Sequence, residues 1–295
     1  MSNAAHAESL QHPVYEDPFK VEPQFEVVKT PGNYHSRHLG TDKLPDKMKV
    51  WKVQSTERGN VVCRAYGFED SPDAEVIALG FNRGKEYGAV GIARHGNVLQ
   101  WGYSDPPSRM TDAGRKLFLN CICYIRQFDG RQPLAHYKSS HRLNAIRLGL
   151  LINRIKDEKF FSGTFAPELM QKYKGDPDGL AGYYRRNLDL IYRERTFLVD
   201  AELAELGLAS NRSVETLGKL IEMFEDGQKG KTARQLLTRY TNESFASKRQ
   251  WQQWFEANRE RIFFTDVGGY KFLVRPKGYP AGQKNQTKIG RALYR

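Results

Sequence analysis

The sequence predicts an α/β domain followed by an all-α domain that ends in a β-hairpin. Three observations support this fold class. Short apolar segments rich in β-branched and aromatic residues, with glycine, proline and aspartate between them, begin at Val50. Segments with helical periodicity occupy most of residues 142–261. Two apolar runs then flank residues 266–269, whose glycines suit the turn of a hairpin.

The N-terminal half contains a lead-in and then the α/β domain. Residues 1–48 are rich in proline, histidine and charge, so we expect an extended lead-in with one short strand at residues 25–28. Strands are predicted at residues 50–53, 61–66, 75–79, 89–93 and 98–101. Thr111 is a suitable N-cap for a helix that continues to Gly130, because apolar residues recur there at spacings of three and four. The α/β domain therefore spans residues 49–130.

The C-terminal half is predicted to be a separate helical domain. Residues 131–141 form a linker, and the domain spans residues 142–274. Helices are expected at residues 142–156, 180–193, 201–206, 213–224 and 231–240. Ser247 and Gln250 have the spacing of a capping box, which opens a further helix whose aromatic stripe is expected to lie in the core. The hairpin at residues 262–274 closes the domain.

The net charge of +12 is unevenly distributed. Residues 275–295 contain six basic residues and no acidic one, together with prolines, glycines and few large apolar residues. We expect a disordered, solvated basic tail. The alternative is an arm that binds nucleic acid or another polyanion, since each Lys or Arg that neutralises a phosphate releases a counterion. The absence of interleaved aromatic residues disfavours nucleic acid.

Several classes are excluded by composition. A chain of 295 residues with 39% hydrophobic residues has enough apolar side chains for a packed core. No apolar run approaches the roughly 20 residues that span a bilayer, so we expect a soluble protein without a membrane span. Three cysteines are too few for a disulfide scaffold. The chain shows no signal peptide, because no basic and apolar segments precede the Ala5-His6-Ala7 sequence.

Histidine and cysteine, the residue types needed for imidazole or thiol chemistry, are confined to the first half of the chain. All seven histidines and all three cysteines lie within the first 141 residues. The cluster that most strongly suggests a binding site lies at the end of a predicted strand and comprises Arg94, His95, Asn97, Trp101 and Tyr103. Ligands often bind near strand ends, so these five residues are candidate ligand-binding residues. His95 is also the candidate catalytic residue, as a general acid or base. The alternative is a structural Gly-Asn turn in which His95 has a structural hydrogen bond.

Two other histidines, His35 and His38, have a spacing that suits a shared metal only in a helix. Pro31, Gly32 and Gly40 favour a loop, and no third ligand motif is nearby, so we expect no metal and no cofactor. No catalytic motif was found: the sequence contains no nucleophile elbow, dinucleotide-binding glycine motif or phosphate-binding loop. Whether the protein is an enzyme stays open.

Several motifs carry a resemblance to a known family. They are His12-Pro-Val-Tyr15, Pro18-Phe19, Ser71-Pro-Asp-Ala-Glu75, Arg94-His-Gly-Asn97, Trp101-Gly102, Met110-Thr111, Phe118, Asn120, Tyr124 and Ile125, and then Val199-Asp200, Leu206-Gly-Leu208, Arg239-Tyr240, Trp251 and residues 263–270. They resemble uncharacterised bacterial proteins, often exported, in which an α/β region similar to the ThuA-like branch of the class I glutamine amidotransferase-like fold precedes a helical domain.

The resemblance implies a partial ThuA-like sheet and, by analogy of fold, a connection with carbohydrates. It also favours export over other locations. About half of an amidotransferase-like domain, including the nucleophile elbow, is missing before His12, so amidotransferase activity is not expected. The leading hypothesis is a binding module for a carbohydrate or similar small polar ligand around His95, Asn97 and Trp101. The alternatives are polyanion binding through the tail and a metal-assisted hydrolase that uses His35, His38 and His95.

Overall fold

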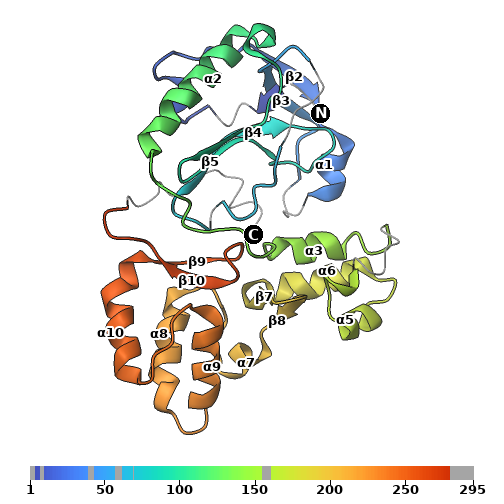
Figure 1. The fold of residues 1–295 in the computed structure, drawn as a ribbon. Coiled ribbons are helices and arrows are strands. Elements are labelled where there is room, and N and C mark those ends of the chain that lie inside the picture. Colours follow the sequence, from blue (N-terminus) through green and yellow to red (C-terminus); the bar gives the residue numbers. More distant parts are fainter. Residues whose placement is uncertain are drawn as a thin grey trace. The chain divides into compact units, whose positions relative to one another are not determined.

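The computed structural model of the chain describes residues 4–6, 10–38, 43–56, 62–68, 70–154 and 161–279. These residues divide into two compact units, one within Met1–Leu134 and the other Ala135–Tyr279. Both units combine helices with antiparallel strands, which confirms a mixture of helix and sheet at the coarse level (Figure 1). Residues 280–295, which form most of the predicted basic tail, lie outside the described residues.

The first unit is built on a six-stranded sheet. Its strands, in spatial order, are β2 (Phe25–Lys29), β3 (Lys47–Lys52), β1 (Ala4–His6), β4 (Ala74–Phe81), β5 (Val90–His95) and β6 (Val98–Trp101). Every neighbouring pair in this order is antiparallel. Its described residues also form α1 (Gly32–Arg37), α2 (Asp112–Ile125) and the 3-10 turns η2 (Pro13–Tyr15), η3 (Pro107–Arg109) and η4 (Arg126–Phe128).

Helix α2 covers one face of this sheet (Figure 1). The helix begins as the sequence predicts, because the Thr111 hydroxyl accepts a hydrogen bond from the Gly114 N–H at 3.0 Å. Leu117 and Cys121 on the inner side of the helix are buried in one cluster with residues of β4 and β5, such as Ile92. The expectation that Cys121 acts as a small apolar core residue is therefore confirmed.

The first 48 residues are more than the extended lead-in that the sequence predicts. Strand β1 pairs with both β3 and β4, and β2 pairs with β3 along its whole length. The segment between β1 and β2 is held by hydrogen bonds to the buried side-chain amide of Asn120. This amide donates to the carbonyls of Val14 at 2.7 Å and Phe19 at 2.6 Å, and its oxygen accepts from the Phe19 N–H at 3.0 Å. Because the partners of this segment are about 100 residues away, its local composition does not show that it is ordered.

One predicted strand of the first unit is not formed. Val61 lies outside the described residues, and in residues 62–66 only Cys63 pairs, through an isolated bridge to Val90. The β-branched residues that favour a strand here therefore lie beside β5 without extending the sheet.

The second unit contains helices and two small hairpins. The helices are α3 (Leu143–Gly149), α5 (Pro167–Lys172), α6 (Pro177–Arg186), α7 (Ala201–Glu205), α8 (Val214–Glu222), α9 (Gly230–Tyr240) and α10 (Lys248–Asn258), with 3-10 turns η5 (Leu188–Leu190), η6 (Met223–Glu225) and η7 (Arg259–Arg261). The hairpins are β7 (Ile191–Arg193) with β8 (Phe197–Val199), and β9 (Ile262–Thr265) with β10 (Lys271–Val274).

The core of this unit confirms two local predictions. Ser247 and Gln250 form the expected capping box at the start of α10. The aromatic stripe of α10 packs inward, since Trp251 is buried and Trp254 and Phe255 pack against the same cluster. Hairpin β9–β10 also forms as predicted, with Thr265 opposite Lys271.

The prediction of an all-α domain is wrong in one region. The helix expected at residues 180–193 ends at Arg186, and Ile191–Arg193 instead form β7, which pairs with β8. Ile191, Tyr192 and Phe197 are the β-branched and aromatic types that favour strands, so the local preference is for a hairpin once the helix has ended. Within the described residues, no helix has both the length and the apolar character needed to cross a membrane.

Candidate functional site

Arg94, at the end of β5, has an internal ion-pair partner. Its Nε donates to Glu75 Oε1 at 2.5 Å, one Nη donates to the Gly96 carbonyl at 2.8 Å, and the guanidinium lies 3.7 Å from the centre of the Phe128 ring. Glu75 is the residue opposite Arg94 on β4. The Arg94 side chain is thus buried and paired, and it joins two strands to the segment after α2.

Glu75 is the centre of a buried polar network. The Tyr124 hydroxyl donates to Glu75 Oε1 at 2.6 Å, and His12 Nε2 lies 3.6 Å from Glu75 Oε2. Burial alone would raise the pKa of Glu75, but hydrogen bonds from His12, Tyr124 and Arg94 outweigh it and lower the pKa to about 2. The carboxylate is therefore ionised and fully engaged. His12 and Tyr124, which the resemblance singles out, have a structural role here.

His95 is held by a different carboxylate. Its Nε2 lies 3.4 Å from Asp73 Oδ1, and Asp73 also accepts from the Ser71 hydroxyl at 2.5 Å and the Leu134 N–H at 2.9 Å. Burial alone would raise the pKa of Asp73, but hydrogen bonds from His95 and Ser71 lower it. These contacts attach the segment before residue 135 to the turn between β5 and β6. The alternative of a structural Gly-Asn turn fits this geometry.

The five predicted ligand-binding residues do not converge. Arg94 and His95 are consecutive in a strand, so their side chains point to opposite faces. Trp101 packs edge-on against Tyr103 at 5.3 Å and against Phe118 of α2, and Tyr103 is buried. Asn97 is exposed on the turn.

The segment with His35 and His38 is helical over Gly32–Arg37, where the sequence favoured a loop. Tyr34 on this short helix is fully buried, and its hydroxyl accepts a hydrogen bond from the Asn82 N–H at 3.0 Å. His35 is exposed, and His38 lies edge-on to Tyr87. Among the described residues, no third histidine, cysteine or carboxylate ligand atom joins them in a metal-binding group.

A cavity of about 380 Å³ lies in the second unit, where sequence reasoning expected only packing and recognition. It is formed by the hairpin β7–β8, by α9 and by the start of β10. Its lining residues are Tyr192, Arg193, Glu194, Gln235, Thr238, Arg239, Tyr240, Gly269, Tyr270 and Lys271. Three cations, one carboxylate and three tyrosines thus surround one space, and volumes of roughly 300 Å³ or more are typical of small-molecule sites.

Arg239 is fixed in this cavity by two carboxylates. One Nη donates to Asp200 Oδ2 at 2.9 Å and the other to Glu202 Oε2 at 2.6 Å. Burial alone would lower the pKa of Arg239, but the hydrogen bond to Glu202 and the charge of Asp200 raise it. Its guanidinium also lies 5.1 Å from the centre of the Tyr192 ring. The charge of Arg239 is therefore compensated by the protein.

Lys271 is held by the last turn of α9. Its ammonium donates to the carbonyls of Thr238 at 3.1 Å, Arg239 at 2.5 Å and Thr241 at 2.9 Å. Carbonyls at a helix C-terminus have no partner within the helix, and a cation there is favoured by the helix dipole. The pKa of Lys271 is lowered, first by burial and then by the nearby charge of Lys138. All three ammonium hydrogens have acceptors.

Tyr240 connects the cavity to a buried polar network. Its hydroxyl donates to Asp200 Oδ2 at 2.5 Å and accepts from Asn211 Nδ2 at 3.3 Å. Asn211 in turn accepts from Arg142 at 3.1 Å. Burial, together with the charge of Asp200, raises the pKa of Tyr240. The hydroxyl is therefore kept protonated and oriented.

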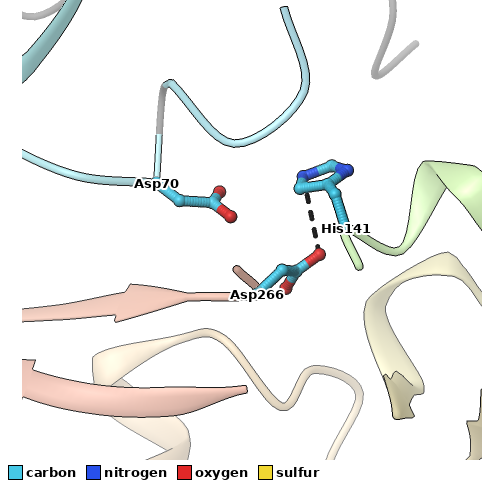
Figure 2. A group of neighbouring side chains, drawn as sticks. All are labelled: Asp70, His141 and Asp266. Carbon is cyan, nitrogen blue, oxygen red and sulfur yellow. Dashed lines mark ion pairs between the residues drawn. The ribbon is translucent and has the colours of Figure 1, made fainter. Parts of the chain in front are cut away.

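The other end of this network is the buried Arg142–Asp266 ion pair. The guanidinium donates to both oxygens of Asp266 at 2.7–3.0 Å, and the Arg142 N–H donates to Asp266 Oδ2 at 2.9 Å. His141 Nε2 lies 3.5 Å from the same carboxylate (Figure 2). Burial lowers the pKa of His141 to about 4. His141 is the last residue of the predicted linker and Arg142 the first of the predicted helical domain, and both are buried in this unit.

Arg193 and Tyr270 complete the wall of the cavity. Arg193 donates to the Ser140 hydroxyl at 3.2 Å and lies 5.2 Å from the centre of the Phe197 ring. Tyr270 is the one non-glycine residue with positive φ (58°) in the described part of the chain, and its hydroxyl donates to the Ser140 carbonyl at 2.8 Å. A left-handed backbone at a bulky residue costs roughly 1–2 kcal/mol, and such strain concentrates at functional sites.

Sequence reasoning did not find this cavity. The second half contains no histidine or cysteine, and the cavity uses arginine, lysine and tyrosine from three separate segments. In the sequence, Arg239, Tyr240 and Tyr270 stand out only as part of a resemblance. The β-branched and aromatic residues in Ile191-Tyr192-Arg193 could have predicted a strand, and the strand brings Tyr192 and Arg193 to the end of α9.

Comparisons of the chain with protein-family models, with curated proteins and with solved structures found no match.

Proposed function

We propose that the second unit binds a small polar ligand in the cavity between β7, α9 and β10. The observation that supports this best is the cavity itself, about 380 Å³ in volume, with three cations and three tyrosines in its lining. Ligand sites combine apolar rings with a few oriented polar groups. The Gln235 amide and the Thr238 hydroxyl in the lining can form hydrogen bonds with hydroxyl groups of the ligand.

The preorganisation of the lining supports binding over simple packing. Asp200 is fully buried, holds both Arg239 and Tyr240, and also caps α7 through the Leu203 N–H at 2.9 Å. Side chains that are fixed before the ligand arrives lose little conformational entropy on binding. The strained backbone of Tyr270 in the same wall is a second, independent indication.

This proposal keeps the hypothesis of a carbohydrate-like polar ligand but moves it away from His95. In the first unit, Arg94 and His95 already have carboxylate partners, and Trp101 is packed against α2. The ThuA-like resemblance stays a hypothesis about ancestry and adds nothing to the choice of cavity.

The test is direct binding of a panel of hydroxylated small molecules, both neutral and acidic, to the full chain. Saturation-transfer NMR identifies binders, and calorimetry measures their affinities. Gln235 lines the cavity from an exposed position on α9, so Gln235→Trp fills the space without disturbing the core. The matched control is Gln252→Trp, at an exposed position of α10.

We expect at least one panel member to bind, a tenfold or greater loss of affinity in Gln235→Trp, and no loss in Gln252→Trp. Either the absence of any binder, or equal affinity of the wild type and Gln235→Trp, would overturn the proposal.

A further inference from the structure

The three cations of the cavity differ in how far the protein already compensates their charges. Arg239 forms ion pairs with Asp200 and Glu202, so two carboxylates face one guanidinium. Lys271 directs its three hydrogens at carbonyls of the α9 C-terminus. Neither residue can turn to an anionic ligand without giving up these contacts.

Arg193 is different. Its guanidinium bonds only neutral groups in the described residues, the Ser140 hydroxyl at 3.2 Å and the Gly163 carbonyl at the long distance of 3.5 Å. No ion pair links Arg193 to a carboxylate within the part of the chain that the structure describes. Arg193 thus has no carboxylate partner and makes fewer and longer hydrogen bonds than Lys271, so it is the cation of the cavity wall that gives up least on turning to a ligand.

The position of Arg193 is fixed by its surroundings. It is the last residue of β7, opposite Phe197 in the hairpin, and the guanidinium stacks near that ring at 5.2 Å. A planar guanidinium with a fixed plane is suited to a planar anion with two oxygens. The neighbouring Glu194 is exposed and lies at the cavity too, so it repels ligands of high negative charge.

We propose that this cavity selects hydroxylated monocarboxylates, such as sugar acids, and that Arg193 binds the carboxylate. The inference rests on the proposed function of the same cavity and adds the ligand class and the residue that determines it. A neutral sugar leaves the Arg193 charge uncompensated, and a phosphate dianion brings two negative charges to a wall with one free cation. A monocarboxylate matches the charge and the planar shape.

Three probes of similar size separate these cases: glucuronate, glucose and glucose 6-phosphate. Calorimetry with the full chain at pH 7 measures each affinity. We expect glucuronate to bind about tenfold or more tightly than glucose and more tightly than glucose 6-phosphate. Increasing salt is expected to weaken glucuronate binding and leave glucose binding unchanged, and this measurement needs no variant.

The variants test the assignment to Arg193. Arg193→Gln is expected to bind glucuronate and glucose alike, whereas Arg193→Lys, which keeps the charge, retains part of the preference. Arg185→Gln, at an exposed position of α6 in the same unit, changes the net charge equally and is expected to bind like the wild type.

The outcomes separate this inference from the proposed function. Equal binding of glucose and glucuronate, or tighter binding of glucose 6-phosphate, overturns the monocarboxylate inference and leaves ligand binding by the cavity in place. An undiminished preference in folded Arg193→Gln overturns the role of Arg193. If none of the three probes binds and Gln235→Trp changes nothing across the wider panel, the proposed function and the inference fail together.

Discussion

Replacement of Gly96 by alanine tests the packing of the turn between β5 and β6. Gly96 follows His95, has a φ of +57°, and its N–H donates to the Asp73 carbonyl at 3.1 Å. A Cβ at this position would lie 2.6 Å from both the Arg131 carbonyl oxygen and the Pro133 nitrogen. Both are backbone atoms, so neither can move away as a flexible side chain could.

The expected cost has two parts. A left-handed backbone at alanine costs roughly 1–2 kcal/mol, and overpacking against fixed atoms adds about 1–3 kcal/mol. Gly96→Ala should therefore lower the free energy of unfolding of the first unit by about 2–5 kcal/mol. Gly130 supplies the matched control: its φ is +76°, but a Cβ there meets nothing within 4 Å. Gly130→Ala should cost only the backbone part, roughly 1–2 kcal/mol.

Hydrogen exchange measured by mass spectrometry across a urea series resolves the two units, which a single fluorescence signal would not. Peptides that cover β4 and β5 report the first unit. Equal destabilisation by Gly96→Ala and Gly130→Ala, or a cost below about 1 kcal/mol for Gly96→Ala, would refute the argument that residues 131–133 are fixed against this turn.

Three further variants, one of them with a matched control, test the buried titratable groups by the same exchange measurement. Asp266→Asn leaves Arg142 buried without a counterion and should destabilise the second unit by about 3–5 kcal/mol. The control Asp189→Asn removes a half-exposed ion pair with Arg212 and should cost less than about 1 kcal/mol; similar costs would contradict this. Glu75→Gln should destabilise the first unit at pH 7, because the lowered pKa of Glu75 stabilises the folded state above about pH 4.5. That contribution is lost as the pH falls toward 2, so the difference in unfolding free energy between the variant and the wild type should shrink over this pH range. A difference that does not change with pH would contradict this. His6→Phe should make the stability of the first unit less sensitive to acid. Burial lowers the pKa of His6 to about 4, so the wild type loses up to about 3 kcal/mol of unfolding free energy as the pH falls from 6.5 to 4. An equally steep loss in the variant would count against this cause.

Features of the fold that depend on adjacent residues could be predicted from the sequence. The Thr111 N-cap, the Ser247 capping box and the hairpin β9–β10 each need only a few consecutive residues, and each is present. Within the first 48 residues, the strand predicted at residues 25–28 forms as β2, whereas β1 and the ordered segment around Val14 and Phe19 could not be predicted. Their order comes from β3 and β4 and from the distant Asn120, and no local pattern encodes those partners.

The side-chain partners of the candidate site in the first unit could not be predicted from the sequence either. His95, Arg94 and Asn97 are adjacent in sequence, and that adjacency suggested one pocket. In a strand, however, neighbours point to opposite faces, so each meets a different partner: Glu75 for Arg94 and Asp73 for His95. The register between β4 and β5, which the sequence does not state, decides that these polar groups are paired and structural.

The net charge of the sequence likewise does not show which cations already have partners within the fold. A net charge of +12 suggests anionic partners, yet Arg94, Arg142 and Arg239 are neutralised by internal carboxylates, and Lys271 is bound by carbonyls. Those cations stabilise the fold and are not free for ligands. A cation indicates a partner only when its own protein leaves the charge uncompensated in an accessible space. Arg193 meets both conditions within the described residues, so the candidate site lies in the half of the chain without histidine.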